Sequence, residues 1–178
     1  MERFRRAFTW LLVAAGLGPA GCFAGYQVVH YKNALGDVQT VAIEAIANRS
    51  FEPGADAIVS DAITSEFLRR GSLRLVDDKS AADLVIGGIV EAVEVQSRSF
   101  SSIQFALEYS VMVRLKLDVR RRDGSEVKLD DRTMQESDLY FASADVEVMR
   151  KNREEAVRRV ASVLAGRLHD GLFERVVP

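Results

Sequence analysis

Residues 105–119 read FALEYSVMVRLKLDV, and this stretch decides the fold. Its odd positions are aliphatic or aromatic throughout, whereas its even positions are mostly polar, with Met112 as the one sizeable apolar exception. Because side chains of a strand alternate between two faces, this period of two predicts one long strand, about 50 Å from end to end, with an apolar face and a polar face. A strand with a single apolar face is typical of an antiparallel sheet that is covered on one side.

The flanking segments predict the element order β-α-β-β-β-β-α. Alternating residues mark the strands, and apolar residues at three- and four-residue spacing mark the helices. We expect strands over residues 39–47, 73–76, 84–95, 105–119 and 127–135, and helices over residues 55–70 and 144–173. The fold class predicted is α+β, a two-layer sandwich in which two helices pack on one face of a mostly antiparallel sheet of four to five strands.

Glycines and polar runs give the expected connections. Gly87-Gly88 inside a predicted strand indicates a bulge or a close approach of another backbone. The serine-rich residues 96–102 are expected to form a loop. Asp123-Gly124 between two alternating runs is a hairpin signal, and it predicts that residues 127–135 return beside the long strand.

The N-terminus has the pattern of a processing segment. Basic residues precede a short apolar run, then small residues, then Cys22, the single cysteine among 178 residues. The tripeptide Ala20-Gly21-Cys22 resembles the end of a bacterial lipobox, although Pro19 stands where that motif usually has leucine. The resemblance implies that Cys22 carries acyl chains such as palmitate. We therefore expect a lipoprotein signal peptide over 1–21, a lipidated tether over 22–37 and one α+β domain over 38–178.

The sequence offers little for catalysis, metals or nucleic acids. The formal net charge is −2, whereas a nucleic-acid binder normally has a basic excess. His169 is expected to be a cation at a helix C-terminus, and no histidine or cysteine set has zinc-ligand spacing. The chain is predicted not to be an enzyme, with no catalytic residues, no metal and no cofactor. Arg120, Arg121 and Arg122 could hold an anion, but such a run is usually a solvated hairpin tip.

Several stretches resemble one known family in their order and spacing. They are Cys22 followed by Gly25-Tyr26, Val41-Ala42-Ile43 leading into NRSFEPG at residues 48–54, the helix end and strand at 67–76, ADLVIGG at 82–88, Glu108-Tyr109 at the start of the long strand, and the helix end at 161–168. This pattern is similar to that of the LptE lipoproteins, which serve lipopolysaccharide assembly in the Gram-negative envelope. The resemblance covers nearly all of the chain after Cys22.

The resemblance implies a place, partners and a role. The place is the periplasmic face of the outer membrane, reached through the lipid anchor. The partner is an LptD-type β-barrel, which the domain would plug and support, and lipopolysaccharide is a further implied ligand. The family's basic lipid-contacting positions fall near Ser102 and Asp145, neither of which is a cation, so Arg98, Arg150 and Lys151 are neighbouring candidates.

Two other classes of protein share parts of this pattern. One is a lipoprotein that activates a periplasmic enzyme such as a peptidoglycan synthase. Its tether is usually long, whereas about fifteen residues here would span roughly 20 Å, which favours a partner in the membrane. The other is a periplasmic lipid-binding module, which would need an internal apolar pocket.

Overall fold

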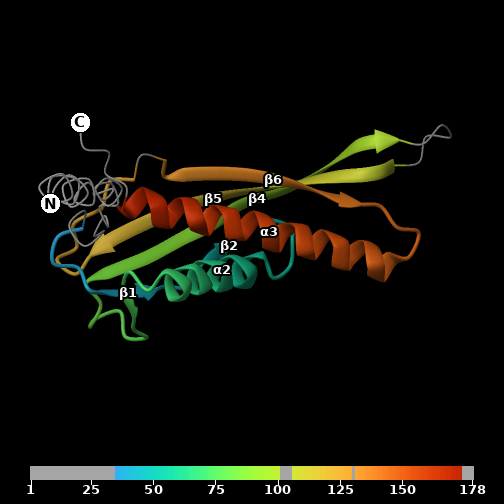
Figure 1. Cartoon of the computed structure of the whole chain (residues 1–178). Helices are drawn as coiled ribbons and strands as arrows, with labels where there is room; N and C mark the ends of the chain where they lie inside the picture. Colours follow the sequence, from blue (N-terminus) through green and yellow to red (C-terminus); the bar gives the residue numbers. More distant parts are fainter. Residues whose placement is uncertain (1–34, 101–105, 130, 174–178) are drawn as a thin grey trace, which may run out of the picture. The chain divides into compact units, whose positions relative to one another are not determined.

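The computed structural model describes residues 35–100, 106–129 and 131–173. The predicted signal peptide, Cys22 and most of the predicted tether lie outside these ranges. Within them, six strands form one sheet and two helices cover one of its faces (Figure 1). The elements are β1 (Thr40–Ile43), β2 (Ala47–Asn48), α2 (Ala55–Arg70), β3 (Arg74–Leu75), β4 (Leu84–Phe100), β5 (Ala106–Arg121), β6 (Thr133–Phe141) and α3 (Val146–Phe173). The predicted two-layer α+β class is confirmed.

The sheet is mixed, with the strand order β3-β1-β4-β5-β6 and with β2 beside β4. The three long strands β4, β5 and β6 are antiparallel neighbours, as the alternating pattern predicted. The short strand β1 instead lies parallel to both β3 and β4, and β2 is parallel to β4. The helical crossover α2 returns the chain to the end of the sheet where β1 began, which makes β3 parallel to β1.

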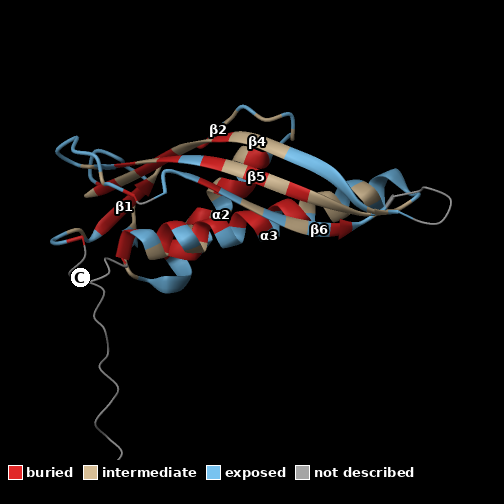
Figure 2. Ribbon diagram, turned by 90° about the horizontal axis from the view of Figure 1, so that it is seen from above, coloured by how far each residue is buried: buried red, intermediate tan, exposed pale blue. Residues whose placement is uncertain are grey.

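The core lies between the apolar face of β5 and the two helices. Val111, Val113, Leu115, Leu117 and Val119 are each at most 3% exposed, which confirms that the helices cover this face. The helices contribute buried side chains that include Ile63 and Phe67 of α2 and Val160, Leu164 and Leu168 of α3. The opposite face of β5, with Arg114, Lys116 and Asp118, carries no helix (Figures 1 and 2).

A buried acid joins the two helices. Glu66 interrupts the apolar stripe of α2, and its carboxylate accepts hydrogen bonds from Arg69 at 2.7 Å and from Arg70 at 2.6 Å. Arg70 also forms an ion pair at 2.6 Å with Asp170 of α3. The bond from Arg69 lowers the pKa of Glu66, so the carboxylate stays charged although the residue is buried.

A bulge or a close approach of another backbone was expected at Gly87-Gly88, and the structure confirms the close approach at Gly88. A Cβ atom on Gly88 would lie 2.7 Å from the carbonyl oxygen of Lys116, so the backbone of β5 leaves no room for a side chain there. A Cβ atom on Gly87 would meet the flexible Glu44 carboxylate at 3.2 Å. The register of β4 shifts further on, between Val90 and Ala92, between Ser97 and Ser99, and between Ser99 and Phe100.

Two predicted strand boundaries were wrong. The strand expected over 39–47 is split into β1 and β2. Residues 96–100, expected to be a loop, continue β4 to Phe100, and they pair with β5 from Gln96↔Ser110 to Phe100↔Ala106. The serines of this segment concealed the strand, because its backbone pairing with β5 does not depend on apolar side chains.

The range predicted for the return strand, residues 127–135, was also wrong. After the Asp123-Gly124 turn, Val127 donates one bond to the carbonyl of Val119, and the strand that pairs along β5 is β6, over Thr133–Phe141. Two residues of β6, Glu136 and Asp138, face the helix layer and form ion pairs with Arg167 and Arg159 of α3. The two acids occupy helix-facing positions where apolar residues would mark a strand. The sequence therefore shows no regular apolar alternation on the helix-facing side of β6, because the arginines that pair with these acids lie on a helix distant in sequence.

Candidate functional site

Six apolar residues with exposed side chains lie at the end of the sheet where β4 and β5 form a tip and β6 leads into α3. We call them the distal patch: Phe100, Leu107, Leu139, Phe141, Val146 and Val148. Phe141 is 70% exposed and Val146 is 79% exposed. Apolar side chains clustered at this level of exposure are typical of a contact surface.

The strand register and a helix contact hold this patch together. Phe141 lies opposite Glu108 of β5, and Phe100 lies opposite Ala106 two residues further along the same strand. The amide of Ala142 donates to the carbonyl of Leu107 at 2.9 Å. Asn152 of α3 donates to the carbonyl of Phe141 at 3.0 Å, which fixes the start of α3 beside the end of β6. Figure 1 shows the tip and the β6–α3 connection at the same end of the sheet.

The three predicted cationic candidates belong to elements that meet at this end. Arg98 lies near the end of β4, and Arg150 and Lys151 lie near the start of α3. Arg150 is held by Glu147 at 3.1 Å and by Glu154 at 3.2 Å. Within the described residues, neither Arg98 nor Lys151 forms an ion pair, and both are exposed. Arg98 and Lys151 are therefore the cations left open to an anionic group.

The apolar members of this site were missed by the sequence analysis, although a signal was present. Leu139 and Phe141 alternate with polar residues in a segment that was not assigned as a strand. Val146 and Val148 precede the apolar stripe of α3 and lie off it. Apolar residues that do not belong to the core-facing side of a strand or helix could have indicated a contact surface.

The sheet face without helices is polar and largely neutralised by its own ion pairs. Glu44 accepts from Lys79 at 3.0 Å and pairs with Arg120 at 3.0 Å, and Arg120 also contacts Asp118 at 2.9 Å. The hydrogen bond from Lys79 lowers the pKa of Glu44. This open face, formed by the polar side of β4, β5 and β6, is a second candidate contact surface.

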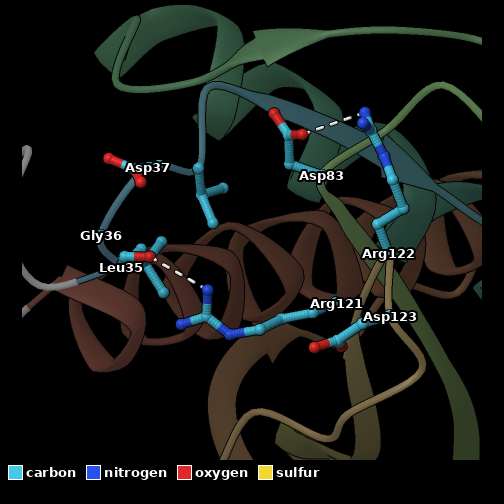
Figure 3. A pocket seen from close by; sticks show the side chains of 8 residues that line it. Leu35, Gly36, Asp37, Asp83, Arg121, Arg122 and Asp123 are labelled. Carbon is cyan, nitrogen blue, oxygen red and sulfur yellow. Dashed lines mark hydrogen bonds and ion pairs between the residues drawn. The ribbon is translucent and has the colours of Figure 1, made fainter.

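The arginines at residues 120–122 are partly exposed to solvent, and each also has a partner on another segment. Arg120 pairs with Glu44, and Arg121 donates to the carbonyl of Leu35 at 3.1 Å. Arg122 pairs with Asp83 at 3.0 Å. Arg121 and Arg122 line a surface hollow of about 420 Å³. Figure 3 shows Arg121 reaching toward Leu35 and Arg122 toward Asp83. Each arginine therefore fastens a different segment to the end of β5.

His169 also departs from its prediction as a helix C-terminal cation. It is buried between the rings of Phe67 and Phe173, and its Nε2 lies 2.7 Å from the Ser72 hydroxyl. Burial lowers the pKa of His169, and the nearby Arg70 lowers it further. The side chain is therefore a neutral part of the core at pH 7.

The described residues offer no metal site, because among them no group of three or more histidine, cysteine or acidic side chains could hold a metal ion. Neither α2 nor α3 is long and apolar enough to cross a bilayer. Cys22 lies outside these ranges, so its acylation stays a prediction.

Comparison with known families gives a match over most of the chain. Residues 38–172 match the model of the LptE family, described as lipopolysaccharide-assembly. No curated protein sequence matches. The matched range begins before β1 and ends one residue before the end of α3, so it includes the whole sheet and both helices.

Solved structures with TM-scores above 0.5 show the same fold at low sequence identity. Lipoprotein B of Nitrosomonas europaea is 12% identical with a TM-score of 0.53, covering 81% of this chain and 87% of its own. A hypothetical protein of Chlamydia trachomatis is 10% identical with a TM-score of 0.52, covering 76% of this chain and 98% of its own. Rare lipoprotein B of Shewanella oneidensis is 14% identical with a TM-score of 0.49, covering 71% and 92%.

Proposed function

The chain belongs to the LptE family of lipopolysaccharide assembly, and from this premise we propose that it is a lipid-anchored outer-membrane protein that plugs and supports an LptD-type β-barrel. The observation that carries the proposal is the family match over residues 38–172. The family is one of assembly, so the role proposed is to hold and position other molecules. Anchoring through acylated Cys22 would keep the domain at the periplasmic face and at a high effective concentration near its barrel.

The open sheet face supports a place inside a barrel. The lumen of an outer-membrane barrel is polar, so a plug needs a polar surface with few unpaired charges. Glu44, Lys79, Arg120 and Asp118 already neutralise one another on that face. Further along the same face, Lys116 is exposed and forms no ion pair with any residue that the structure describes, and Arg114 lies 3.9 Å from Glu94. These two cations are therefore available for contacts with a barrel wall.

The distal patch supports contact with lipopolysaccharide. That lipid combines anionic groups with acyl chains, so its binding surface needs cations beside apolar side chains. Arg98 and Lys151 supply cations that have no ion pair among the described residues, and Phe100, Phe141 and Val146 supply exposed apolar surface at the same end of the sheet. Arg150 is a weaker donor, because two glutamates already share its guanidinium.

The first test is affinity purification of the full chain, tagged at its C-terminus, from outer membranes in mild detergent. Mass spectrometry should identify a large β-barrel of the LptD type in about equal amount. Recovery of a periplasmic synthase without a barrel would overturn the proposal in favour of an enzyme activator.

A paired variant makes this test specific to the open face. Arg114→Glu together with Lys116→Glu reverses both of its remaining cations and should reduce barrel recovery severalfold. Lys128→Glu, an exposed lysine outside the sheet, is the control and should leave recovery unchanged. Equal losses from both variants would argue against the open face as the barrel contact.

A further inference from the structure

The outer edge of β6 is closed by side chains of the same chain. The amides of Ser137 and Leu139 donate to the carboxylates of the acids that precede them, at 3.0 and 2.7 Å. Helix α3 closes the carbonyls of this edge: Arg167 donates to Gln135 at 3.3 Å, Arg159 to Leu139 at 2.9 Å and Asn152 to Phe141 at 3.0 Å. No further strand can therefore pair along β6.

The outer edge of β4 is closed only over its first half. Strand β2 pairs with β4 as far as Val90, whose carbonyl accepts from the amide of Arg49 at 2.9 Å. From Ala92 to Ser97, β4 keeps one unbroken register with β5, and that register shifts on either side of this stretch. Figure 2 shows the far part of β4 as exposed. Residues 92–97 are thus a short regular strand that has, among the described residues, a neighbour on one side only.

The register shows which backbone groups of this stretch point away from β5. The amide of Leu117 and the carbonyl of Leu107 form hydrogen bonds on the β6 side, so the odd-numbered residues of β5 direct their backbone groups away from β4. Their partners in β4 are Val93, Val95 and Ser97, which by the same alternation direct their own groups outward. Within the described ranges these outward groups have no hydrogen-bond partner. An open edge of this kind is a template for another strand, and natural proteins usually block it.

The side chains of the stretch define what such a strand would meet. Val93 and Val95 lie opposite core-facing residues of β5 and so face the helix layer. Val95 is nevertheless 40% exposed, because α2 runs away from this part of β4 (Figure 1). Glu94 between them faces the open side, and in the described part of the chain its one ion pair is a long one, at 3.9 Å from Arg114. An added strand would therefore meet an apolar, an acidic and an apolar position in turn.

The predicted tether is too short to supply this strand. The carbonyl of Leu35 accepts a hydrogen bond from the arginine that lies opposite Leu84, at the start of β4. Val95 lies about 36 Å further along β4. Residues 23–34 span at most about 41 Å when fully extended, so nearly all of them would be used in reaching Val95. The strand must then come from another molecule.

We propose that residues 93–97 of β4 accept, as an added strand, an extended segment of the barrel partner in which two apolar residues flank a basic one. The apolar residues would lie beside Val93 and Val95, and the basic residue beside Glu94. The strands of a closed barrel wall already pair with one another, so the segment comes from a loop outside the wall. This inference rests on the proposed function, whose single barrel also leaves the edge of β4 to the barrel and not to a second copy of the chain.

The test uses the full chain in cells, with a photo-crosslinking amino acid in place of Gln96, which is exposed on the open stretch. After illumination and affinity purification, mass spectrometry should identify a crosslinked peptide from a loop of the barrel that contains the apolar–basic–apolar pattern. The same amino acid in place of Gln135, exposed on the closed edge of β6, is the matched control and should not yield that peptide.

Two substitutions in the crosslinking chain test the pairing itself. The amide of Val95 points outward, so Val95→Pro keeps the pairing with β5, removes a donor to the added strand and should reduce the crosslink at least fivefold. Ser137→Pro, at an outward amide of the closed edge, is the control and should leave the crosslink unchanged. Glu94→Lys, a surface change that needs no backbone adjustment, should reduce the crosslink severalfold by opposing the basic residue.

The outcomes separate this proposal from the function on which it rests. If the barrel is recovered but Gln96 crosslinks to a strand of the barrel wall, to the same chain or to a second copy, the added strand is overturned and the barrel partnership stands. A crosslink that survives both Val95→Pro and Glu94→Lys would overturn it in the same way. Recovery of no barrel at all would overturn the proposed function together with this inference.

Discussion

The two ends of the sheet are built in opposite ways. At the end that contains β1, β3 and the Asp123-Gly124 turn, which we call the proximal end, side chains bind segments far apart in the sequence. The Asp83 carboxylate accepts from the amides of Gln39 and Thr40 and from the Thr40 hydroxyl, at 3.1, 3.0 and 2.8 Å, and Arg122 pairs with it. At the distal end the side chains of Phe100, Phe141 and Val146 are exposed.

This difference assigns the stability of the fold to the proximal end and binding of other molecules to the distal end. Bonds between distant segments, such as those of Asp83, stabilise the topology, because they join the start of β1 to the start of β4 beside the backbone ladder of these two strands. Exposed apolar groups add little to the stability of the isolated chain, since they remain in water after folding. We therefore expect substitutions at the proximal end to change unfolding, and substitutions at the distal end to change binding.

The largest effect is expected from Asp83→Ala. It removes an acceptor of three hydrogen bonds and leaves the amide of buried Thr40 without that partner, so the free energy of unfolding should fall by about 2–3 kcal/mol. Urea denaturation followed by circular dichroism measures this change.

The control for Asp83 is Asp78→Ala. Asp78 also accepts two bonds, but both come from Ser80 in an exposed local turn, so Asp78→Ala should lower the free energy of unfolding much less than Asp83→Ala. If the two variants were equally destabilised, the bonds of Asp83 between distant segments would not be what holds the proximal end.

The features of the two ends that depend on the spacing of apolar residues along the chain could be predicted from the sequence. The bounds of α2 agree with the prediction at both ends, and the apolar face of β5 is the core face. The bonds of Asp83, Arg121 and Arg122 could not be predicted, because their partners lie about 40 or more residues away and leave no periodic signal. The distal patch was missed for a related reason, since Leu139 and Phe141 belong to a strand whose inward positions carry acids.

A smaller effect at the proximal end is expected from pH. Because burial lowers the pKa of His169, the folded chain binds fewer protons than the unfolded chain below the usual histidine pKa of about 6.5. The free energy of unfolding should therefore fall as the pH drops from about 7.5 to 5.5, by on the order of 1 kcal/mol.

The groups around His169 define the control for this pH dependence. Ser72, Phe67 and Phe173 surround its ring, and Asp170, Arg70 and Glu66 are the charged groups near it. Glu66 has a lowered pKa and stays ionised throughout this pH range. His169→Gln, which can still bond to Ser72, should make the unfolding free energy nearly independent of pH between about 7.5 and 5.5. An unchanged slope in that variant would assign the pH dependence to another group.

The smallest effect on stability, and the sharpest test of the contrast, is expected from Phe141→Ser. The ring is 70% exposed, so its replacement removes little buried apolar area, and the backbone carbonyl that binds Asn152 is retained. The free energy of unfolding should change by less than about 0.5 kcal/mol. Tyr140→Ser, at the buried neighbour that stacks on Tyr109, should lower the free energy of unfolding by about 2 kcal/mol or more.

If the distal patch is a contact surface, Phe141→Ser should still weaken retention of lipopolysaccharide severalfold in vesicle or micelle binding, although it folds normally. A variant that keeps both its stability and its binding would show that Phe141 is exposed without serving a contact.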